Sequence, residues 1–299
     1  FAIFGIFRGL QNTFWPMVVA LIGAALNIVL DFALVYGIEG YIPALQLEGA
    51  AYASLIAQAI MAVLSLILVL TKTNVNLKLK FPIHPELWRL VGMALNLFVR
   101  TIALNVALYL ANSFATDYGA SYIAAQTILI NIWLFSAFFI DGYAAAGNIL
   151  AGRFLGAKDY NSLWELSKKL TKYGLIISGG LMLVSVLLYE PLGLLFSKEP
   201  EVITRFTALF FIIILMQPIN AVAFIFDGIF KGMGEMKYLR NVLMAATFFG
   251  FVPAIFIGDY FGLKLYAVWI AFTIWMLIRS GALILKFRQR FKPKVSSDI

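Results

Sequence analysis

The sequence predicts an all-α integral membrane protein with eight transmembrane helices. Of its 299 residues, 62% are hydrophobic and only 13% are charged, and the mean hydropathy is +0.91. Soluble domains carry about 25% charged residues, so a soluble protein of this composition would expose large apolar patches and aggregate. The apolar runs are also long enough, at about 20 residues, to cross a hydrocarbon core of about 30 Å. They far exceed ordinary strands and lack the period-two alternation of strands.

The predicted spans are apolar runs bounded by Gly, Pro or charged residues. They cover 14–37, 48–71, 90–113, 121–151, 173–190, 202–230, 238–258 and 263–287. The lysine-rich run 158–172 predicts an amphipathic segment in the membrane interface ahead of the short span 173–190. The chain begins at Phe1 within an apolar run that lacks the basic start and cleavage site of a signal peptide. We therefore expect an N-terminally truncated fragment that opens on the end of a helix.

The distribution of basic residues predicts the orientation. When the loops are assigned to alternating sides, 19 of the 23 Lys and Arg residues fall on one side, and only Lys198, Arg205 and Lys264 fall on the other. Lys and Arg concentrate in cytoplasmic loops, so the C-terminus should be cytoplasmic. The net charge of +8 then reflects topology and argues against a nucleic-acid partner. We expect a monomeric, multi-pass protein of the plasma membrane, with the lipid bilayer as its partner.

An internal repeat indicates two lobes. Gly5-Ile-Phe-Arg-Gly9 and Gly228-Ile-Phe-Lys-Gly232 each end an apolar run on the same side, six spans apart. This predicts a 6+6 parallel repeat of twelve helices in total, of which eight are present in full. The expected parts are the end of helix 4 with helices 5 and 6 of the N-lobe (1–72), a cytoplasmic interlobe loop (73–89), helices 7–12 of the C-lobe (90–287) and a cytoplasmic tail (288–299).

Ionisable side chains inside spans are costly and often functional, and Asp31 is the first of them. Asn27 lies four residues earlier, so the two side chains share a helix face. Carboxylate and amide oxygens suit a proton or a sodium ion, which makes Asn27 and Asp31 the candidate cation site. The alternative is a hydrogen-bonded pair that joins two helices. The repeat-equivalent positions hold Gly250 and Ala254, so a cation site of this kind belongs to the first lobe only.

Other polar residues within the spans are candidates for a cavity or for coupling. Arg100 needs an anion, and Asp141 in the next span is its expected partner; contact with a substrate is the alternative. Asp141 and Asp227 each precede a Gly, and either could act in function or pair locally with Arg100 or Lys231. Four amides could line a cavity or bond helices together: they are Gln126, Asn131, Gln217 and Asn220.

Enzyme signatures are absent from the sequence. There is no Cys, the single His84 lies in a polar loop, and no zinc-protease, nucleophile-elbow or P-loop motif occurs. We therefore expect no enzyme and no cofactor. Any transport across the membrane would be driven by an ion gradient, with a proton or sodium as coupling ion.

The spans carry short motifs in a recognisable order. In the first part these are Arg8-Gly-Leu-Gln-Asn-Thr13 with Pro16-Met17, Asn27-x-x-x-Asp31, and Gly49-Ala-Ala51 with Gln58. Further along come Phe139-Ile-Asp-Gly-Tyr-Ala144, Gly152-Arg153 with Gly156-Ala157, and Gln217-Pro218 ahead of Asp227-Gly228. Over essentially its whole length, the chain resembles the multidrug and toxic compound extrusion (MATE) transporters, in their DinF-like branch.

This resemblance implies a two-lobe, twelve-helix secondary active antiporter with a central cavity. Such a protein exports cationic or amphipathic organic compounds in exchange for protons or sodium by alternating access. The family's first-lobe cation site matches Asn27 and Asp31, and it also uses an Asp on a first helix that this sequence does not contain. The alternative is a flippase for lipid-linked precursors, whose cavity should hold several deep cations where this sequence shows only Arg100.

Overall fold

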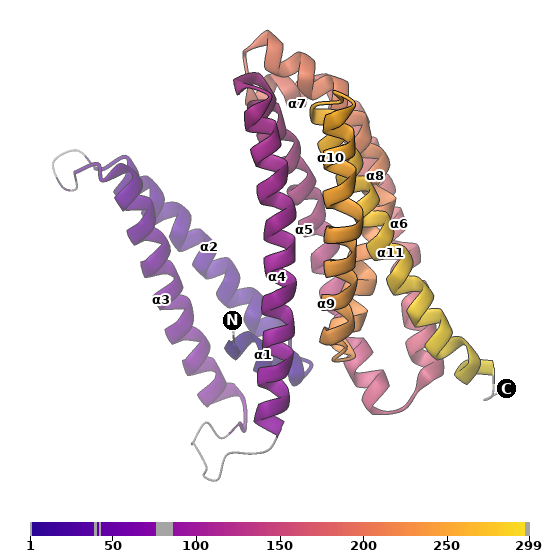
Figure 1. The fold of residues 1–299 in the computed structure, drawn as a ribbon. Helices are drawn as coiled ribbons and strands as arrows, with labels where there is room; N and C mark the ends of the chain where they lie inside the picture. The colour runs from indigo at the N-terminus through magenta and orange to yellow at the C-terminus, as the bar shows by residue number, and fades with distance from the viewer. Residues whose placement is uncertain (1, 39–40, 42, 76–85, 297–299) are drawn as a thin grey trace. The chain divides into compact units, whose positions relative to one another are not determined.

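The computed structural model describes residues 2–38, 41, 43–75 and 86–296, and the regular elements of this part of the chain are helices (Figure 1). Within it, eight helical segments are long and apolar enough to cross a membrane. The prediction of an all-α fold with eight spans is therefore confirmed. The chain forms two compact units, residues 1–83 and 84–299. Lone His84 lies outside the described residues.

The first unit is a helical hairpin preceded by a short helix. It consists of α1 (Ala2–Gly9), α2 (Phe14–Val35) and α3 (Gln46–Lys72), with α2 and α3 side by side (Figure 1). A Cβ at Gly23 would collide with the Met61 side chain, and one at Gly49 would collide with the backbone of Leu34. Glycine at these two positions therefore allows α2 and α3 to approach closely.

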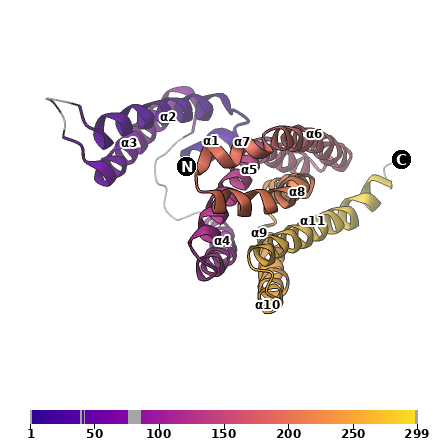
Figure 2. The same cartoon turned by 90° about the horizontal axis from the view of Figure 1, so that it is seen from above.

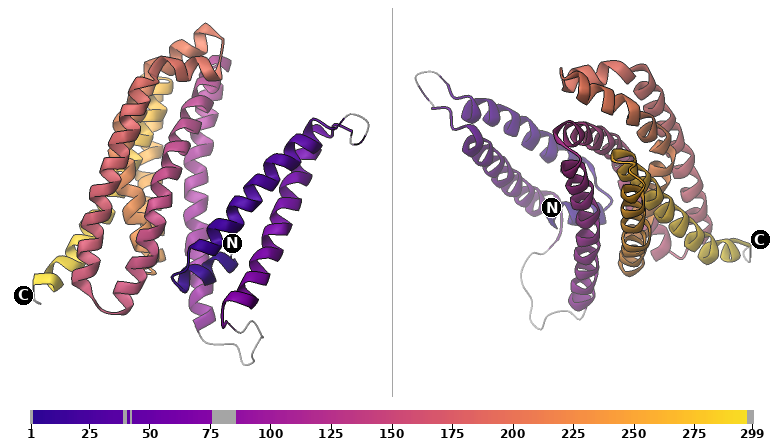
Figure 3. Two further views of the ribbon diagram at one scale, coloured as in Figure 1. Left: turned by 180° about the vertical axis from the view of Figure 1, so that it is seen from behind. Right: turned by 45° about the horizontal axis from the view of Figure 1, so that its top comes forward.

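The second unit is a bundle whose long helices run back and forth between two ends (Figures 2 and 3). The turns 157–159 and 233–235 mark one end, which we call the basic end because most Lys and Arg of this unit lie near it. A short helix, α7, marks the opposite end (Figure 1). The elements are α4 (Glu86–Asp117), α5 (Ala120–Gly156), α6 (Tyr160–Leu187), α7 (Tyr189–Phe196), α8 (Pro200–Gly232), α9 (Met236–Ala245), the π-helical turn η1 (Ala246–Phe251), α10 (Val252–Tyr260) and α11 (Leu265–Ser296).

Helix α8 is the most deeply buried span and packs most extensively against α5. A Cβ at Gly228 would lie 2.5 Å from the carbonyl oxygen of Ala144, and one at Gly152 would lie 2.9 Å from that of Gly232. Small residues four apart let membrane helices approach to backbone contact. In lipid there is no hydrophobic driving force between helices, so close van der Waals packing stabilises their association. This close crossing fixes α8, which carries Asp227, against its neighbour.

The lysine-rich run 158–172, which was predicted to be an interfacial segment, continues directly into its span. Helix α6 runs without a break from Tyr160 to Leu187, and its first turn is capped by Asp159, whose carboxylate accepts a hydrogen bond from the Ser162 N–H at 2.9 Å. One face of the lysine-rich part is buried at Leu163 and Leu170. Because this apolar face packs against the bundle, the segment continues the span and does not lie apart from it.

A local change of helix type lies next to Pro253. The π-helical turn Ala246–Phe251 directly precedes α10, and Pro253 lies in the first turn of α10. Proline cannot donate the intrahelical hydrogen bond of its position, and here a π turn, a rare single-turn variant of the helix, directly precedes it. Gly23, by contrast, lies within the continuous helix α2 and allows close packing against Met61.

The internal repeat extends to backbone conformation. After both Gly5–Gly9 and Gly228–Gly232, the N–H three residues beyond the last Gly donates to the carbonyl of the central Phe, at 2.9 and 3.0 Å. The residue two beyond the last Gly has a positive φ in both, 60° at Gln11 and 75° at Gly234. This is the Schellman ending of a helix. The same hydrogen bonds and a positive φ follow Gly152-Arg-Phe-Leu-Gly156 at the end of α5, a third copy that the sequence analysis missed.

Candidate functional site

The predicted cation-site residues lie one turn apart on α2, facing α3. The Asn27 amide donates a long hydrogen bond of 3.4 Å to the Ser54 hydroxyl of α3. The Oδ1 atom of Asp31 is buried and has no hydrogen-bond partner among the described residues. A buried carboxylate oxygen without a partner is costly, and it is the kind of atom that a proton or a cation would satisfy. Their role as a cation site remains a prediction.

Ser54 is a residue of this site that the sequence analysis missed. It lies four residues before Gln58, which the resemblance had singled out, so both belong to one polar stripe of α3. That spacing is the signal that could have found it. Through its bond to Asn27, Ser54 connects α3 to the helix that carries Asp31.

The second unit holds a buried ionic cluster centred on Asp227 of α8. Its Oδ1 lies 2.7 Å from Nη2 of Arg100 on α4, and its Oδ2 lies 2.7 Å from Nζ of Lys231 on α8. Nη2 of Arg279 on α11 lies 3.7 Å from the same Oδ1. The Asp227 side chain is 5% exposed. One carboxylate therefore joins three helices through three cations, and we call these four residues the Asp227 cluster.

The prediction that Arg100 pairs with Asp141 is wrong, because the anion that Arg100 reaches comes from α8. Asp141 is exposed and makes no ion pair with any described residue, although its charge interacts with Lys231, Arg100 and Arg279. Helix α4 packs mainly against α9, and only lightly against α5, which carries Asp141. The alternative in which Asp227 pairs with Arg100 or Lys231 is confirmed for both cations.

Arg279 is the second deep cation, which the sequence analysis had counted among the residues at the cytoplasmic side. Its side chain is 3% exposed, and its guanidinium lies 4.7 Å from the centre of the Trp275 ring, one turn away on α11. An arginine over an aromatic face gains a cation–π attraction that is stronger when desolvated. In the sequence, an Arg four residues after a Trp inside a span was the pattern that could have indicated this buried arginine.

A buried hydrogen-bond chain positions the two arginines. The Trp275 indole N–H donates to the Thr247 hydroxyl at 3.0 Å, and this hydroxyl donates to the Ala103 carbonyl at 3.4 Å. Ala103 lies one turn from Arg100 on α4, just as Trp275 lies one turn from Arg279 on α11. The π turn that carries Thr247 thus links the two helices that supply the guanidinium groups to Asp227.

The four candidate amides differ in their surroundings. Gln126 accepts a hydrogen bond of 2.9 Å from the Trp269 indole, so it joins α5 to α11. Asn131 is exposed and bonds to the carbonyl of Thr127 in its own helix. Gln217 and Asn220, one turn apart on α8, are buried, and within the described part of the chain both polar atoms of Gln217 and the Asn220 carbonyl oxygen have no partner.

Eight candidate membrane spans among the described residues, with buried polar groups in both units, define a polytopic membrane protein. The chain belongs to the MATE family, because the family model MatE matches residues 97–261. It is 30% identical over 281 residues to Protein DETOXIFICATION 43 of Arabidopsis thaliana, covering 92% of this chain and 51% of that protein. It is 23% identical over 290 residues to DNA damage-inducible protein F of Escherichia coli K12, covering 95% and 61%. The chain therefore spans between about half and two thirds of these relatives.

The fold is also that of solved MATE transporters. The crystal structure of the Vibrio cholerae MATE transporter VcmN in the bent form matches with a TM-score of 0.83 at 16% identity, over 97% of this chain and 65% of that one. This likeness confirms the two-lobe, twelve-helix transporter fold to which the eight spans belong. The flippase alternative gains no support from these matches.

Proposed function

We propose that the protein is a secondary active antiporter that exports cationic or amphipathic organic compounds in exchange for protons or sodium. The observation that carries the proposal is the buried Oδ1 of Asp31, which has no hydrogen-bond partner among the described residues and lies one turn from Asn27. Membership of the MATE family supports the efflux class.

The coupling step would occur on the α2–α3 hairpin. Binding of a proton or sodium at Asp31 neutralises a carboxylate that is otherwise costly inside a span. Because Asn27 bonds to Ser54 across the hairpin, the bound ion would favour one packing of α2 on α3 over another. A ligand shifts a conformational equilibrium only by its differential affinity for the two states, so this proposal requires Asp31 to bind the ion more tightly in one packing than in the other.

The Asp227 cluster has a different role in this proposal. It contains three cations and one carboxylate, and the nearby Asp141 adds a second negative charge. The surplus of positive charge disfavours a cationic substrate at this place. The cluster therefore serves to hold α4, α8 and α11 together, which leaves cation binding to the first unit.

Orientation and assembly belong to the same proposal. The concentration of Lys and Arg at one side supports a cytoplasmic C-terminus in the plasma membrane. We propose a monomer without a cofactor, in which the proton or sodium acts as coupling ion.

The test is efflux of a fluorescent organic cation by cells that express the full-length protein with Asp31→Asn. The matched control is Asp117→Asn, the same change at an exposed carboxylate at the end of α4. We expect Asp31→Asn to abolish efflux driven by a proton or sodium gradient and the control to retain it. Applying each gradient separately identifies the ion. Efflux and ion coupling that survive Asp31→Asn unchanged would refute the proposal.

A further inference from the structure

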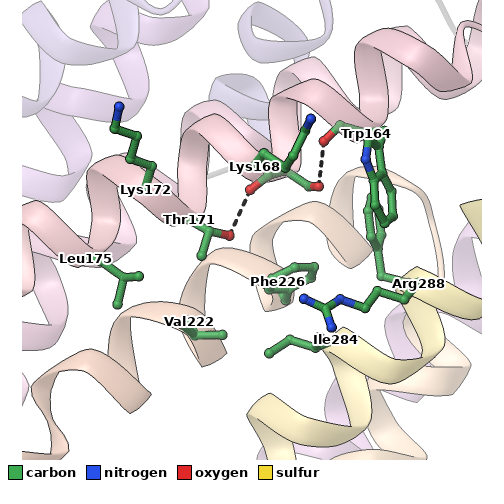
Figure 4. Close-up of a pocket in the computed structure, with 11 residues that line it drawn as sticks. Trp164, Lys168, Thr171, Lys172, Leu175, Val222, Phe226, Ile284 and Arg288 are labelled. Atoms are coloured by element: carbon green, nitrogen blue, oxygen red, sulfur yellow. Dashed lines mark hydrogen bonds between the residues drawn. The ribbon is translucent and has the colours of Figure 1, made fainter. Parts of the chain in front are cut away.

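A groove at the surface of the second unit lies between α6, α8 and α11 (Figure 4). Its volume is about 460 Å³. The walls are mostly apolar and aromatic, and the residues that define them are Trp164 and Leu175 of α6, Val222 and Phe226 of α8, and Ile284 and Phe287 of α11. The mechanism proposed above does not use this groove.

Three cations line the same groove: Lys168 and Lys172 of α6 and Arg288 of α11. Lys168 forms an ion pair with Glu165. Lys172 and Arg288 make no ion pair or side-chain hydrogen bond with another residue that the structure describes, and both are exposed. Figure 4 shows Arg288 extending toward Phe226 of α8. Two basic groups from different helices are thus available to an anion at this groove.

The hydroxyl groups of the groove are already engaged. Thr171 donates to the Ser167 carbonyl at 2.8 Å, and Ser167 donates to the Trp164 carbonyl at 2.7 Å (Figure 4). Both bonds lie within α6. Neutral hydrogen-bond donors are therefore few, and an occupant would be recognised by its charge and its apolar surface.

The polar and apolar parts of the groove are ordered along the membrane normal. On α6, which starts at the basic end, Leu175 lies deeper than Lys168 and Lys172. On α11, which runs the opposite way, Ile284 lies deeper than Arg288, and on α8 Val222 lies deeper than Phe226. All three helices therefore place cations or aromatics near the basic end and aliphatic side chains toward the membrane centre. This is the polarity of a phospholipid with its headgroup at that end.

We propose that this groove binds an anionic phospholipid of the cytoplasmic leaflet. The phosphate lies between Lys172 and Arg288, and an acyl chain lies along Leu175, Val222 and Ile284. Basic pockets between membrane helices at the cytoplasmic side attract anionic headgroups, and each Lys or Arg near the surface adds to the attraction. The apolar walls favour a lipid over free phosphate, which would leave them exposed.

The test compares lipid retention by the full-length protein, purified from vesicles of equal parts phosphatidylglycerol and phosphatidylcholine and analysed by native mass spectrometry. We expect retained phosphatidylglycerol, and about tenfold weaker retention by Lys172→Gln with Arg288→Gln. The control is Lys169→Gln with Lys237→Gln. It removes the same charge from exposed positions at the same end that do not line the groove, so retention should be unchanged.

A second variant tests the apolar half without altering charge. Leu175→Trp replaces an aliphatic side chain of the groove wall with a larger, aromatic one. Because position 175 is exposed, the variant should fold, and it should reduce retention of lipids with either headgroup. If the groove variant and the charge control lost phosphatidylglycerol to the same extent, the proposal would be overturned. Diffuse attraction of the lipid to the basic end would then explain the retention. Retention of phosphatidylcholine equal to that of phosphatidylglycerol, or full retention by Leu175→Trp, would overturn it as well.

Discussion

Arg100 and Asp227 form a buried ion pair between α4 and α8, with Nη2 of the arginine 2.7 Å from Oδ1 of the aspartate. The two residues are 127 positions apart in sequence. Lys231 and Arg279 contact the same carboxylate, so its removal would leave three cations facing one another, with Arg279 only 3% exposed to solvent. The cluster is therefore stable as a set and costly to break in part.

Replacing Asp227 by Asn should destabilise the protein by about 3–5 kcal/mol, the range for removing one partner of a buried pair. Asp141→Asn is the matched control, because that carboxylate is exposed and makes no ion pair with the described residues. The measurement is the thermal unfolding of both variants of the full-length protein in detergent. Equal unfolding temperatures for the two variants would show that the Asp227 cluster contributes no more than a single exposed charge.

The crossing of α5 and α8 should not tolerate a methyl group at Gly228. The added Cβ would meet the carbonyl oxygen of Ala144, a backbone atom that can move only with its helix. Overpacking of this kind costs about 1–3 kcal/mol, which exceeds the gain in helix propensity from Gly to Ala. Gly281→Ala is the control, since a Cβ there meets nothing within 4 Å. Thermal unfolding should fall for the first variant and stay equal or rise for the second.

Trp275 and Thr247 should show energetic coupling. Thr247→Val leaves the buried indole N–H without its acceptor and should cost about 1–3 kcal/mol, whereas Trp275→Phe removes the donor itself. Because the two side chains share this hydrogen bond, the double variant should lose less than the sum of the single variants. Unfolding free energies of the four proteins in detergent give the coupling directly. Strict additivity would mean that the two side chains act independently.

Much of the fold is predictable because its signals are local. The length of each apolar run and the Gly, Pro and charged residues around it fix a span within a few residues. The lysines of the run 158–172 predict an interfacial helix, whereas the burial of Leu163 and Leu170 on its other face becomes evident only where α6 packs against α8. The sequence pattern shows that the helix has a charged face and an apolar face, but it does not show whether lipid or protein covers the apolar face.

Contacts within one helix could be predicted from the sequence, whereas contacts between helices could not. Asn27 with Asp31, and Asp227 with Lys231, are found by helix spacing, because both members of each pair lie on one helix. The partner of Arg100 stayed open between Asp141 and Asp227, and Arg279 was missed, because the order of spans in the chain does not say which helices pack together. Ser54 was missed because its partner lies across the α2–α3 hairpin.

The turn between α4 and α5 should give the protein a stability loss at alkaline pH. The Tyr118 hydroxyl donates a hydrogen bond of 2.6 Å to Oδ1 of Asp259 on α10. Burial raises the pKa of Tyr118 above its ordinary value, and the hydrogen bond to Asp259 raises it further. In the unfolded chain the phenol titrates near pH 10. The stabilising contribution of neutral Tyr118 is therefore complete below about pH 10 and is lost as the pH rises toward the folded pKa.

Thermal unfolding of the full-length protein in detergent at about pH 9 and about pH 11, on either side of the ordinary tyrosine pKa, measures this loss. Tyr118→Phe should be less stable than the unaltered protein at the lower pH, because it lacks the bond to Asp259, and it should lose less on going to the higher pH. Tyr260→Phe is the control, since Tyr260 is 86% exposed and should not change the pH dependence. If Tyr118→Phe lost as much stability between the two pH values as the unaltered protein, another group would be responsible, because a phenylalanine has no proton to release.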